Sequence, residues 1–152
     1  MKKFSIILLA LFMLTLSSCK EGDGIMTFKD GVFTVNTTNL GKDIEGYNGA
    51  TPLLITIEKK VITSIEVLDN EETPRYLKRA EEGIFKPLIG RTPEELVIDE
   101  IDAVAGATYS SEALIANLRL GLQYYVDNKF NKRSYWTSGG GRGGRKSSEK
   151  RK

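Results

Sequence analysis

Residues 102–129 read DAVAGATYSSEALIANLRLGLQYYVDNK, and this stretch decides the fold because it holds the best-defined element of the chain. From about Ser110 to Lys129, apolar side chains recur at the spacing of one face of a helix. The members of this face are Leu114, Ile115, Leu118, Leu122, Tyr125 and Val126. One broad apolar stripe predicts a helix that packs against a sheet.

Thr108 lies directly ahead of this helix, behind Gly106 and Ala107, which have almost no side chain. Such a pair allows a bulky group to approach the backbone closely. A helix N-terminus also offers unpaired N–H groups and the positive end of the helix dipole to a phosphate. A second interpretation is structural, since Thr108 in this position would also serve as a helix N-cap beside a tight turn.

The composition restricts the chemistry open to Thr108. The chain has no histidine and one cysteine. It therefore cannot assemble a histidine-activated nucleophile, a His-ligated metal site or a thiolate-based zinc or iron–sulfur site. A threonine hydroxyl without a base is a poor nucleophile, but another protein can bring the base and metal for a phosphoryl transfer. The inventory predicts no catalytic residue and no metal site, and favours an acceptor of a cofactor.

Strand patterns precede the turn. Gly31 to Asn36 alternates well enough for an opening strand. Residues 53–58 and 61–68 are rich in β-branched side chains and flank Lys59-Lys60, which predicts a hairpin. Lysine is unfavourable in a two-residue hairpin turn, where Asn-Gly would be expected.

Helix signals follow the hairpin. Thr73-Pro74 predicts an N-cap with proline at the first helical position, a helix over residues 75–82 and a stop at Gly83. Thr92-Pro93-Glu94-Glu95 repeats the signal as a capping box over a short helix, and residues 98–104 are predicted as a strand. The expected fold is α+β, a small antiparallel sheet packed against helices in a single domain.

The N-terminus has the pattern of a targeting segment. Lys2 and Lys3 precede an apolar stretch from Phe4 to Leu16, and Leu16-Ser17-Ser18-Cys19 resembles a bacterial lipoprotein cleavage box. We expect a signal peptide at 1–18 and a lipidated Cys19, with a plain secretory signal as the alternative. The protein would then be a membrane-anchored lipoprotein facing the periplasm or cell exterior.

The C-terminal end differs from the rest of the chain. Residues 139–152 contain six basic residues, one acid and no apolar residue, whereas the whole chain carries a net charge of +2. Residues 131–152 are predicted to be a flexible, solvated Gly/Arg/Lys-rich tail. Contact with anionic lipid headgroups or an acidic partner is the alternative, and no nucleic acid is expected outside the cytoplasm. The remaining boundaries are a linker at 19–30 and one domain at 31–130.

The run from Asp102 to Ser111 resembles the attachment motif of the FMN-binding domain family. That family includes the flavin subunits of the sodium-pumping NADH:quinone reductase and of the related ferredoxin:NAD oxidoreductase. The resemblance extends over about residues 31–126 and includes the Gly46-Tyr47 loop and Glu72-Thr73-Pro74. It implies a small α+β domain in which a separate flavin transferase joins FMN through its phosphate to Thr108.

The resemblance also implies roles for the neighbours of Thr108. Gly106 and Ala107 would give room for the phosphate ester, and Ser110 and Ser111 would hydrogen-bond its oxygens. Asp102 would help the transferase recognise the site or fix the turn.

Other residues are candidates for the flavin pocket. Glu72 and Thr73 occupy the family's other recurrent motif and would line the pocket or cap a helix. Tyr47, Tyr76 and Tyr109 are candidates for stacking on the isoalloxazine ring or for ordinary packing.

Two positions depart from the family pattern. Ala105 stands where members usually have serine or threonine, so flavinylation would be slower or absent if the transferase reads that hydroxyl. Lys60 replaces a glycine that is usual at the hairpin turn.

Three hypotheses follow for the function. The first is a lipid-anchored flavoprotein that carries FMN on Thr108 and exchanges electrons with membrane redox partners, matured by a flavin transferase. The second is a module that binds FMN or another phosphorylated ligand reversibly at the same helix end. The third is a structural lipoprotein that contacts a partner through its basic tail.

Overall fold

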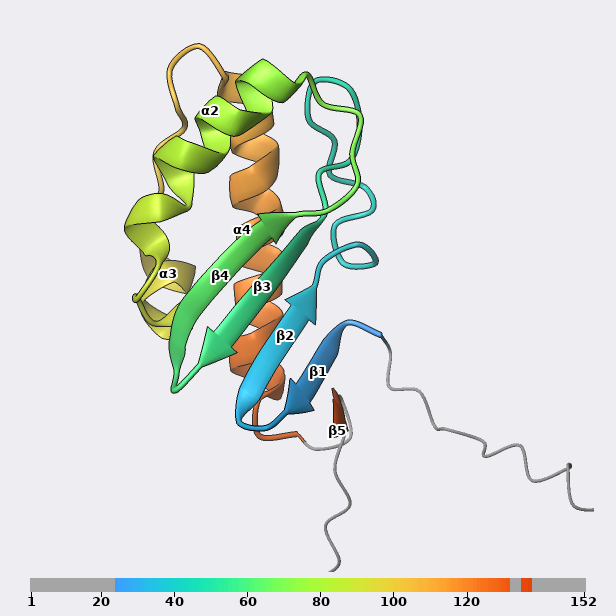
Figure 1. Cartoon of the computed structure of the whole chain (residues 1–152), viewed down its shortest axis with the longest axis vertical. Coiled ribbons are helices and arrows are strands. Elements are labelled where there is room, and N and C mark those ends of the chain that lie inside the picture. Colours follow the sequence, from blue (N-terminus) through green and yellow to red (C-terminus); the bar gives the residue numbers. More distant parts are fainter. Residues whose placement is uncertain (1–23, 132–134, 138–152) are drawn as a thin grey trace, which may run out of the picture.

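The computed structural model describes residues 24–131 and 135–137, which form one sheet with helices packed on it (Figure 1). The strands are β1 Met26–Lys29, β2 Val32–Asn36, β3 Leu53–Glu58, β4 Val61–Val67 and β5 Tyr135–Thr137. The helices are α2 Pro74–Ile84, the short 3₁₀ helix η2 Lys86–Leu88, α3 Pro93–Ile98 and α4 Thr108–Asn128. The predicted signal peptide, Cys19 and residues 138–152 lie outside the described residues.

The sheet has the strand order β4-β3-β2-β1-β5. Strands β1 to β4 pair antiparallel, and β5 runs parallel to β1. This is the α+β arrangement that the sequence predicts. Among the described helices, none has both the length and the apolar character needed to cross a membrane.

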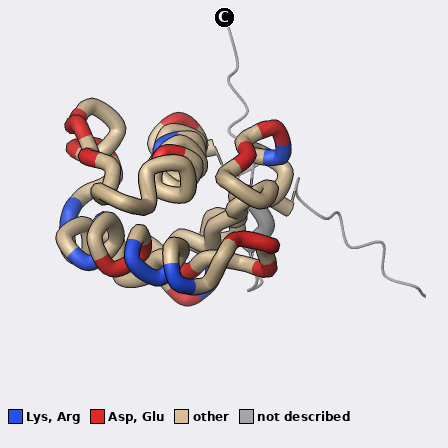
Figure 2. Tube along the Cα trace, turned by 90° about the horizontal axis from the view of Figure 1, so that it is seen from above, with Lys and Arg blue, Asp and Glu red and all other residues tan. Residues whose placement is uncertain are grey.

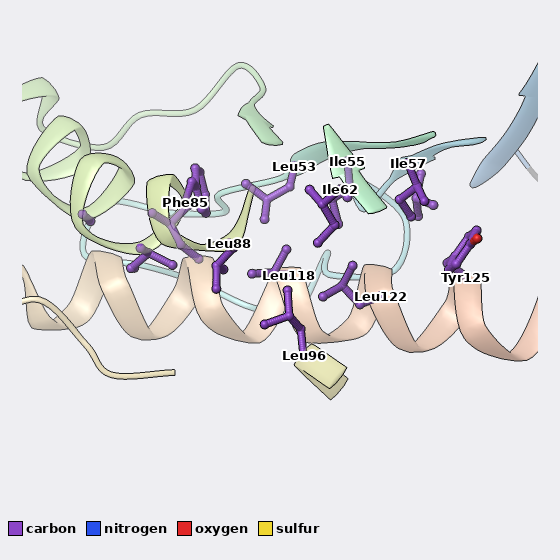
Figure 3. Close-up of a cluster of buried hydrophobic side chains, with 14 of the residues drawn as sticks. Leu53, Ile55, Ile57, Ile62, Phe85, Leu88, Leu96, Leu118, Leu122 and Tyr125 are labelled. Atoms are coloured by element: carbon purple, nitrogen blue, oxygen red, sulfur yellow. The ribbon is translucent and has the colours of Figure 1, made fainter. Parts of the chain in front are cut away.

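The core lies between the sheet and α4. Leu53, Ile55 and Ile57 are buried on one side of β3, while the residues between them are only partly buried, as expected for a strand with one covered face. They face the predicted stripe of α4, where Leu118 and Leu122 are fully buried (Figure 3). Full burial of each such side chain contributes about 1.5–3 kcal/mol. This packing fixes α4, and with it the position of the turn at residues 104–108.

The predicted hairpin is confirmed. Strands β3 and β4 are joined by Lys59 and Lys60, which both have positive φ, 50° and 70°. Two consecutive left-handed residues are the requirement of a type I′ turn, whose twist matches that of the paired strands. The two lysines therefore adopt a conformation that glycine or asparagine adopts more readily.

The sheet is larger than the sequence pattern predicts. Strand β1 lies within the predicted linker and pairs with β2 across a turn at Asp30 and Gly31, whose φ values are also positive. Strand β5 lies within the predicted tail. The paired sheet therefore extends beyond both ends of the predicted domain.

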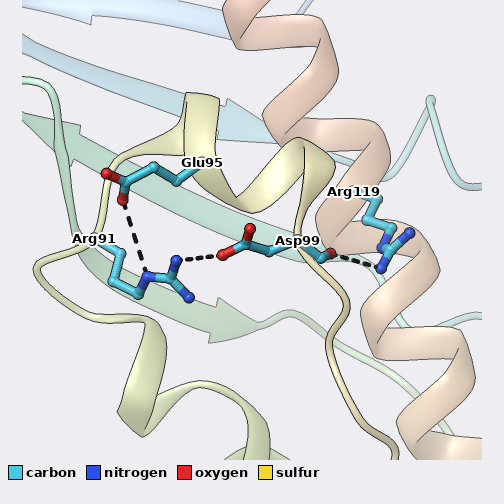
Figure 4. Close-up of polar contacts among 4 residues, drawn as sticks. All are labelled: Arg91, Glu95, Asp99 and Arg119. Carbon is cyan, nitrogen blue, oxygen red and sulfur yellow. Dashed lines mark hydrogen bonds and ion pairs between the residues drawn. The ribbon is translucent and has the colours of Figure 1, made fainter.

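The predicted strand over 98–104 is wrong. Helix α3 ends at Ile98, and residues 99–107 form neither helix nor strand. Their polar groups bond to α4 instead of a neighbouring strand: Val104 N–H donates to Ser111 Oγ (3.1 Å), and Arg119 donates to the Asp99 carbonyl (2.9 Å; Figure 4). The segment thus runs back along α4 to the turn ahead of Thr108.

The predicted stop at Gly83 is also wrong, because α2 continues to Ile84. A Cβ atom at Gly83 would lie 2.5 Å from Val104 Cγ2, so glycine permits close packing here and does not end the helix. The helix starts are confirmed at Pro74 and Pro93, but neither Thr73 nor Thr92 makes a side-chain capping bond. Glu95 pairs with Arg91 at 4.0 Å, and Arg91 also binds Asp99 (Figure 4).

Candidate functional site

An open cleft of about 310 Å³ lies at the N-terminal end of α4. Three segments form it: the loop between β2 and β3, the first turn of α2 and the turn leading into α4, which meet at the upper end of the molecule in Figure 1. The lining residues are Tyr47, Tyr76, Gly106, Ala107, Thr108, Tyr109 and Ser110. The structure therefore brings together the central motif residues and all three tyrosines singled out in the sequence.

Thr108 is the first residue of α4, and Ala107 takes the N-cap position. The cap residue makes no side-chain bond, and within the described residues the exposed Thr108 hydroxyl makes no hydrogen bond. The structural interpretation of Thr108 as an N-cap is therefore wrong by one position. The N–H of Ser111 donates to the Ala107 carbonyl (2.9 Å), which is the first hydrogen bond of helix α4. The N–H groups of residues 108–110 therefore have no acceptor within the helix.

Two exposed tyrosines and a glycine with positive φ lie in the same cleft as Thr108. Tyr47 and Tyr109 are 70% and 69% exposed, with ring centroids 6.4 Å apart. Gly106 has a φ of 80°, in the left-handed region that favours glycine. A Cβ atom at Gly106 would lie 3.3 Å from Nη1 of Arg79, a residue of α2 that belongs to none of the sequence motifs.

A buried carboxylate ties the three segments together. Glu72 is 6% exposed. Its Oε2 accepts the Ser110 hydroxyl (2.5 Å) and its Oε1 accepts the Asn48 N–H (2.7 Å). A Cβ atom at Gly46 would lie 2.5 Å from Oε1, so glycine is needed for the loop to approach. Glu72 thus lies behind the cleft and fixes its walls.

Thr73 takes part in the same arrangement, since its Oγ1 accepts a hydrogen bond from Asn48 Nδ2 (3.3 Å). The hydroxyl therefore holds the loop that carries Tyr47 and does not cap α2. Glu72 and Thr73 are close to the cleft, but neither is among its lining residues.

A second buried network holds the rest of the same loop on α4. Asn117 is fully buried and accepts the Thr37 hydroxyl (3.3 Å), while its Nδ2 donates to Thr51 Oγ1 (3.4 Å) and the Ala113 carbonyl (3.2 Å). A Cβ atom at Gly41 would lie 1.7 Å from Asn117 Oδ1. These contacts rigidify the loop between β2 and β3.

The two serines of the motif are already engaged. Ser110 donates to Glu72, and the fully buried Ser111 accepts from Val104 N–H. Asp102 is exposed and is not among the lining residues. Backbone N–H groups at the start of α4 and the side chain of Arg79 have donors available for a phosphate.

Charge around the molecule is mixed in sign. Figure 2 shows basic and acidic residues interspersed along the described part of the trace. Burial raises the pKa of the Tyr125 hydroxyl in the core, and burial followed by the nearby Glu82 raises the pKa of the Glu81 carboxyl on α2. Neither residue lines the cleft.

A family model described as the FMN-binding domain matches residues 46–123. The matched range holds every segment that lines the cleft, together with Glu72 and Asn117. The chain belongs to the FMN-binding domain family. No curated protein and no solved structure matches the chain.

The cleft of this FMN-binding domain fits the group that the family binds. Tyrosine rings provide apolar faces for an aromatic ring system. Unpaired N–H groups at the start of α4 and the nearby guanidinium provide donors for a phosphate. The cleft is therefore the candidate site for FMN in this domain.

Proposed function

We propose that the protein is a lipid-anchored, extracytoplasmic flavoprotein that carries FMN covalently on Thr108 and exchanges electrons with membrane redox partners. The observation that carries the proposal is the placement of Thr108. Its hydroxyl is exposed, unbonded within the described residues and located at a helix N-terminus inside an aromatic cleft. A capping threonine would have its oxygen bonded to the helix, whereas an acceptor needs this oxygen free.

Attachment needs a second protein. Thr108 Oγ1 forms a bond to the phosphorus of an activated flavin donor of the phosphoric anhydride class, and the anhydride P–O bond breaks. The hydroxyl proton passes to a base of the flavin transferase, because this chain has no histidine to take it. The transferase also supplies the metal that neutralises charge during the transfer.

The chain's own residues hold and orient the bound group. The N–H groups of residues 108–110 would hold the phosphate, and Tyr47, Tyr76 and Tyr109 would provide aromatic surface for the ring. Glu72 fixes the positions of the loop, α2 and α4 behind the cleft, because it accepts hydrogen bonds from Asn48 and Ser110. The flavin supplies one- and two-electron chemistry when bound.

The location outside the cytoplasm rests on the N-terminal pattern. Lipidation of Cys19 after removal of residues 1–18 would attach the domain to a membrane, where acyl chains contribute about 0.8 kcal/mol per buried CH₂. The domain would then meet redox partners in or near that membrane.

Attachment is tested on protein from a host that contains the transferase. After denaturation, the wild-type protein should remain fluorescent in a gel, and its intact mass should include one flavin group. Thr108→Ala should lose both signals, whereas Thr108→Ser should keep them because it retains the hydroxyl. Thr92→Ala, at the start of α3, is the matched control and should remain loaded.

A flavin signal that persists in Thr108→Ala would move the attachment to another residue. Wild-type protein that is unmodified after co-expression with the transferase would exclude Thr108 as an acceptor.

Reversible binding of FMN is the second candidate, and Ala105 is the observation that favours it. This exposed residue lacks the hydroxyl that the family usually has beside the attachment point. A reversible site would bind FMN to the folded protein without changing its intact mass.

A further inference from the structure

The guanidinium of Arg79 lies over the attachment turn. A Cβ atom built on Gly106 would be 3.3 Å from Arg79 Nη1 and 3.7 Å from Cζ, so the planar group is in contact range of the bare glycine. Thr108 is two positions after Gly106, and two residues span at most about 7 Å of chain. The Arg79 guanidinium therefore lies at the same end of α4 as Thr108.

Within the described residues, the side chain of Arg79 forms no ion pair or hydrogen bond, although its guanidinium has five N–H donors. The other arginines near α3 and α4 are engaged: Arg91 binds Asp99, and Arg119 donates to the Asp99 carbonyl (Figure 4). Arg79 is thus a cation whose donors remain available.

The surroundings of Arg79 are electrostatically unfavourable without an anion. The N-terminus of α4 carries the positive end of the helix dipole, which arises from the unpaired N–H groups of residues 108–110. The Arg79 guanidinium near Gly106 is a second positive source at this helix end. An anion bound between the two would relieve the repulsion and accept hydrogen bonds from both.

We propose that Arg79 binds the phosphate ester on Thr108, which makes it the cationic part of a phosphate subsite between α2 and α4. The proposal rests on the function proposed above. The planar fork of arginine can donate two parallel hydrogen bonds to phosphate oxygens, a geometry that lysine cannot reproduce. Ser110 does not compete for this role because its hydroxyl donates to Glu72, and Ser111 is fully buried.

The test compares two flavins that differ only in phosphate. The mature chain, made without the transferase, is titrated with FMN and with riboflavin while quenching of flavin fluorescence is measured. The variants are Arg79→Gln, Arg79→Lys and the control Lys78→Gln, which removes a positive charge from the adjacent position of α2, where Lys78 lies near Glu82 (4.0 Å). Thermal unfolding confirms that each variant is folded.

Arg79→Gln should weaken FMN binding about tenfold, the loss expected for a charge-assisted contact, and leave riboflavin binding unchanged. Arg79→Lys should give an intermediate loss of FMN affinity, and Lys78→Gln should behave like the wild type. An equal loss of affinity for FMN and riboflavin in Arg79→Gln would overturn the proposal. The proposal would also be overturned if the wild-type protein bound FMN no more tightly than riboflavin, or bound neither flavin.

Intact mass separates this proposal from the attachment itself. If the wild-type protein lacks a covalent flavin but prefers FMN in an Arg79-dependent way, the attachment is refuted and the phosphate subsite still stands. Flavinylated wild-type protein with unchanged FMN affinity in Arg79→Gln would refute only the subsite.

Discussion

Replacing Glu72 by alanine should loosen the cleft on three sides at once. The carboxylate accepts the N–H of Asn48 from the loop that carries Tyr47, and it accepts the hydroxyl of Ser110 from the first turn of α4. Glu72 itself lies two residues before Pro74, where α2 begins.

The magnitude follows from the exposure of the two donors. Ser110 is 3% exposed, so its hydroxyl would be left buried without an acceptor, at a cost of about 1–3 kcal/mol. Asn48 is exposed, and its N–H can turn to water at little cost. We expect a total loss of about 2–3 kcal/mol in the free energy of unfolding, which for a domain of this size lowers Tm by about 10–20 °C.

Two variants isolate the cause in a thermal unfolding assay. Glu72→Gln should lose less than about 1 kcal/mol, because its oxygen still accepts from Asn48 and its amide can donate to a rotated Ser110 hydroxyl. Glu71→Ala removes the neighbouring exposed carboxylate and should leave Tm unchanged. In protein from a transferase host, Glu72→Ala should also carry less flavin than either control at a temperature where all remain folded. Equal unfolding temperatures for Glu72→Ala and Glu71→Ala would refute the assignment of Glu72 as the tie between the three segments.

Two further predictions concern parts of the fold away from the cleft. Lys60→Gly should raise the free energy of unfolding by about 0.5–1 kcal/mol in urea titrations, because glycine adopts the φ of 70° without steric cost; a loss of stability would show that the lysine side chain contributes to the hairpin. Glu81→Gln should stabilise the protein at neutral pH but not well below the ordinary pKa of 4.5. Burial raises the pKa of Glu81 in the folded state, so the folded wild type binds the carboxyl proton more tightly than the unfolded chain does. The wild type therefore loses stability relative to the variant as pH rises above 4.5. Parallel stability–pH curves for the two proteins would contradict this.

Elements with a strong local pattern were predictable. The stripe of α4 and the β-branched strands of the hairpin have the periodicity of their secondary structure, and packing then only confirms it. The missed strand β1 also had a local signal, since Asp30-Gly31 is a typical type I′ turn sequence between two β-rich segments. The segment over 98–104 failed for a different reason. Its β-branched residues suit a strand, but a serine of α4 binds the backbone N–H that a strand would have used.

The site also has residues that a local sequence pattern marks and residues that only folding brings together. Thr108 and its small neighbours are contiguous in the sequence and were predicted as a unit. The bond between Glu72 and Ser110 joins residues 38 positions apart, and the bond between Thr37 and Asn117 joins residues 80 positions apart. No local pattern encodes such pairs. Arg79 was missed for the same reason, because its proximity to Gly106 results from the way α2 packs against α4.

The openness of the cleft bears on why a tether would be useful. With Tyr47 and Tyr109 about two-thirds exposed, a flavin in this cleft would retain much contact with solvent. Few buried contacts mean weak reversible binding, and FMN released at the proposed extracytoplasmic location would diffuse away. A tether to Thr108 would keep the effective concentration of flavin at the cleft on the order of millimolar. Stacking too weak to retain free FMN would then hold the ring in place, and the exposed edge would remain accessible to a redox partner.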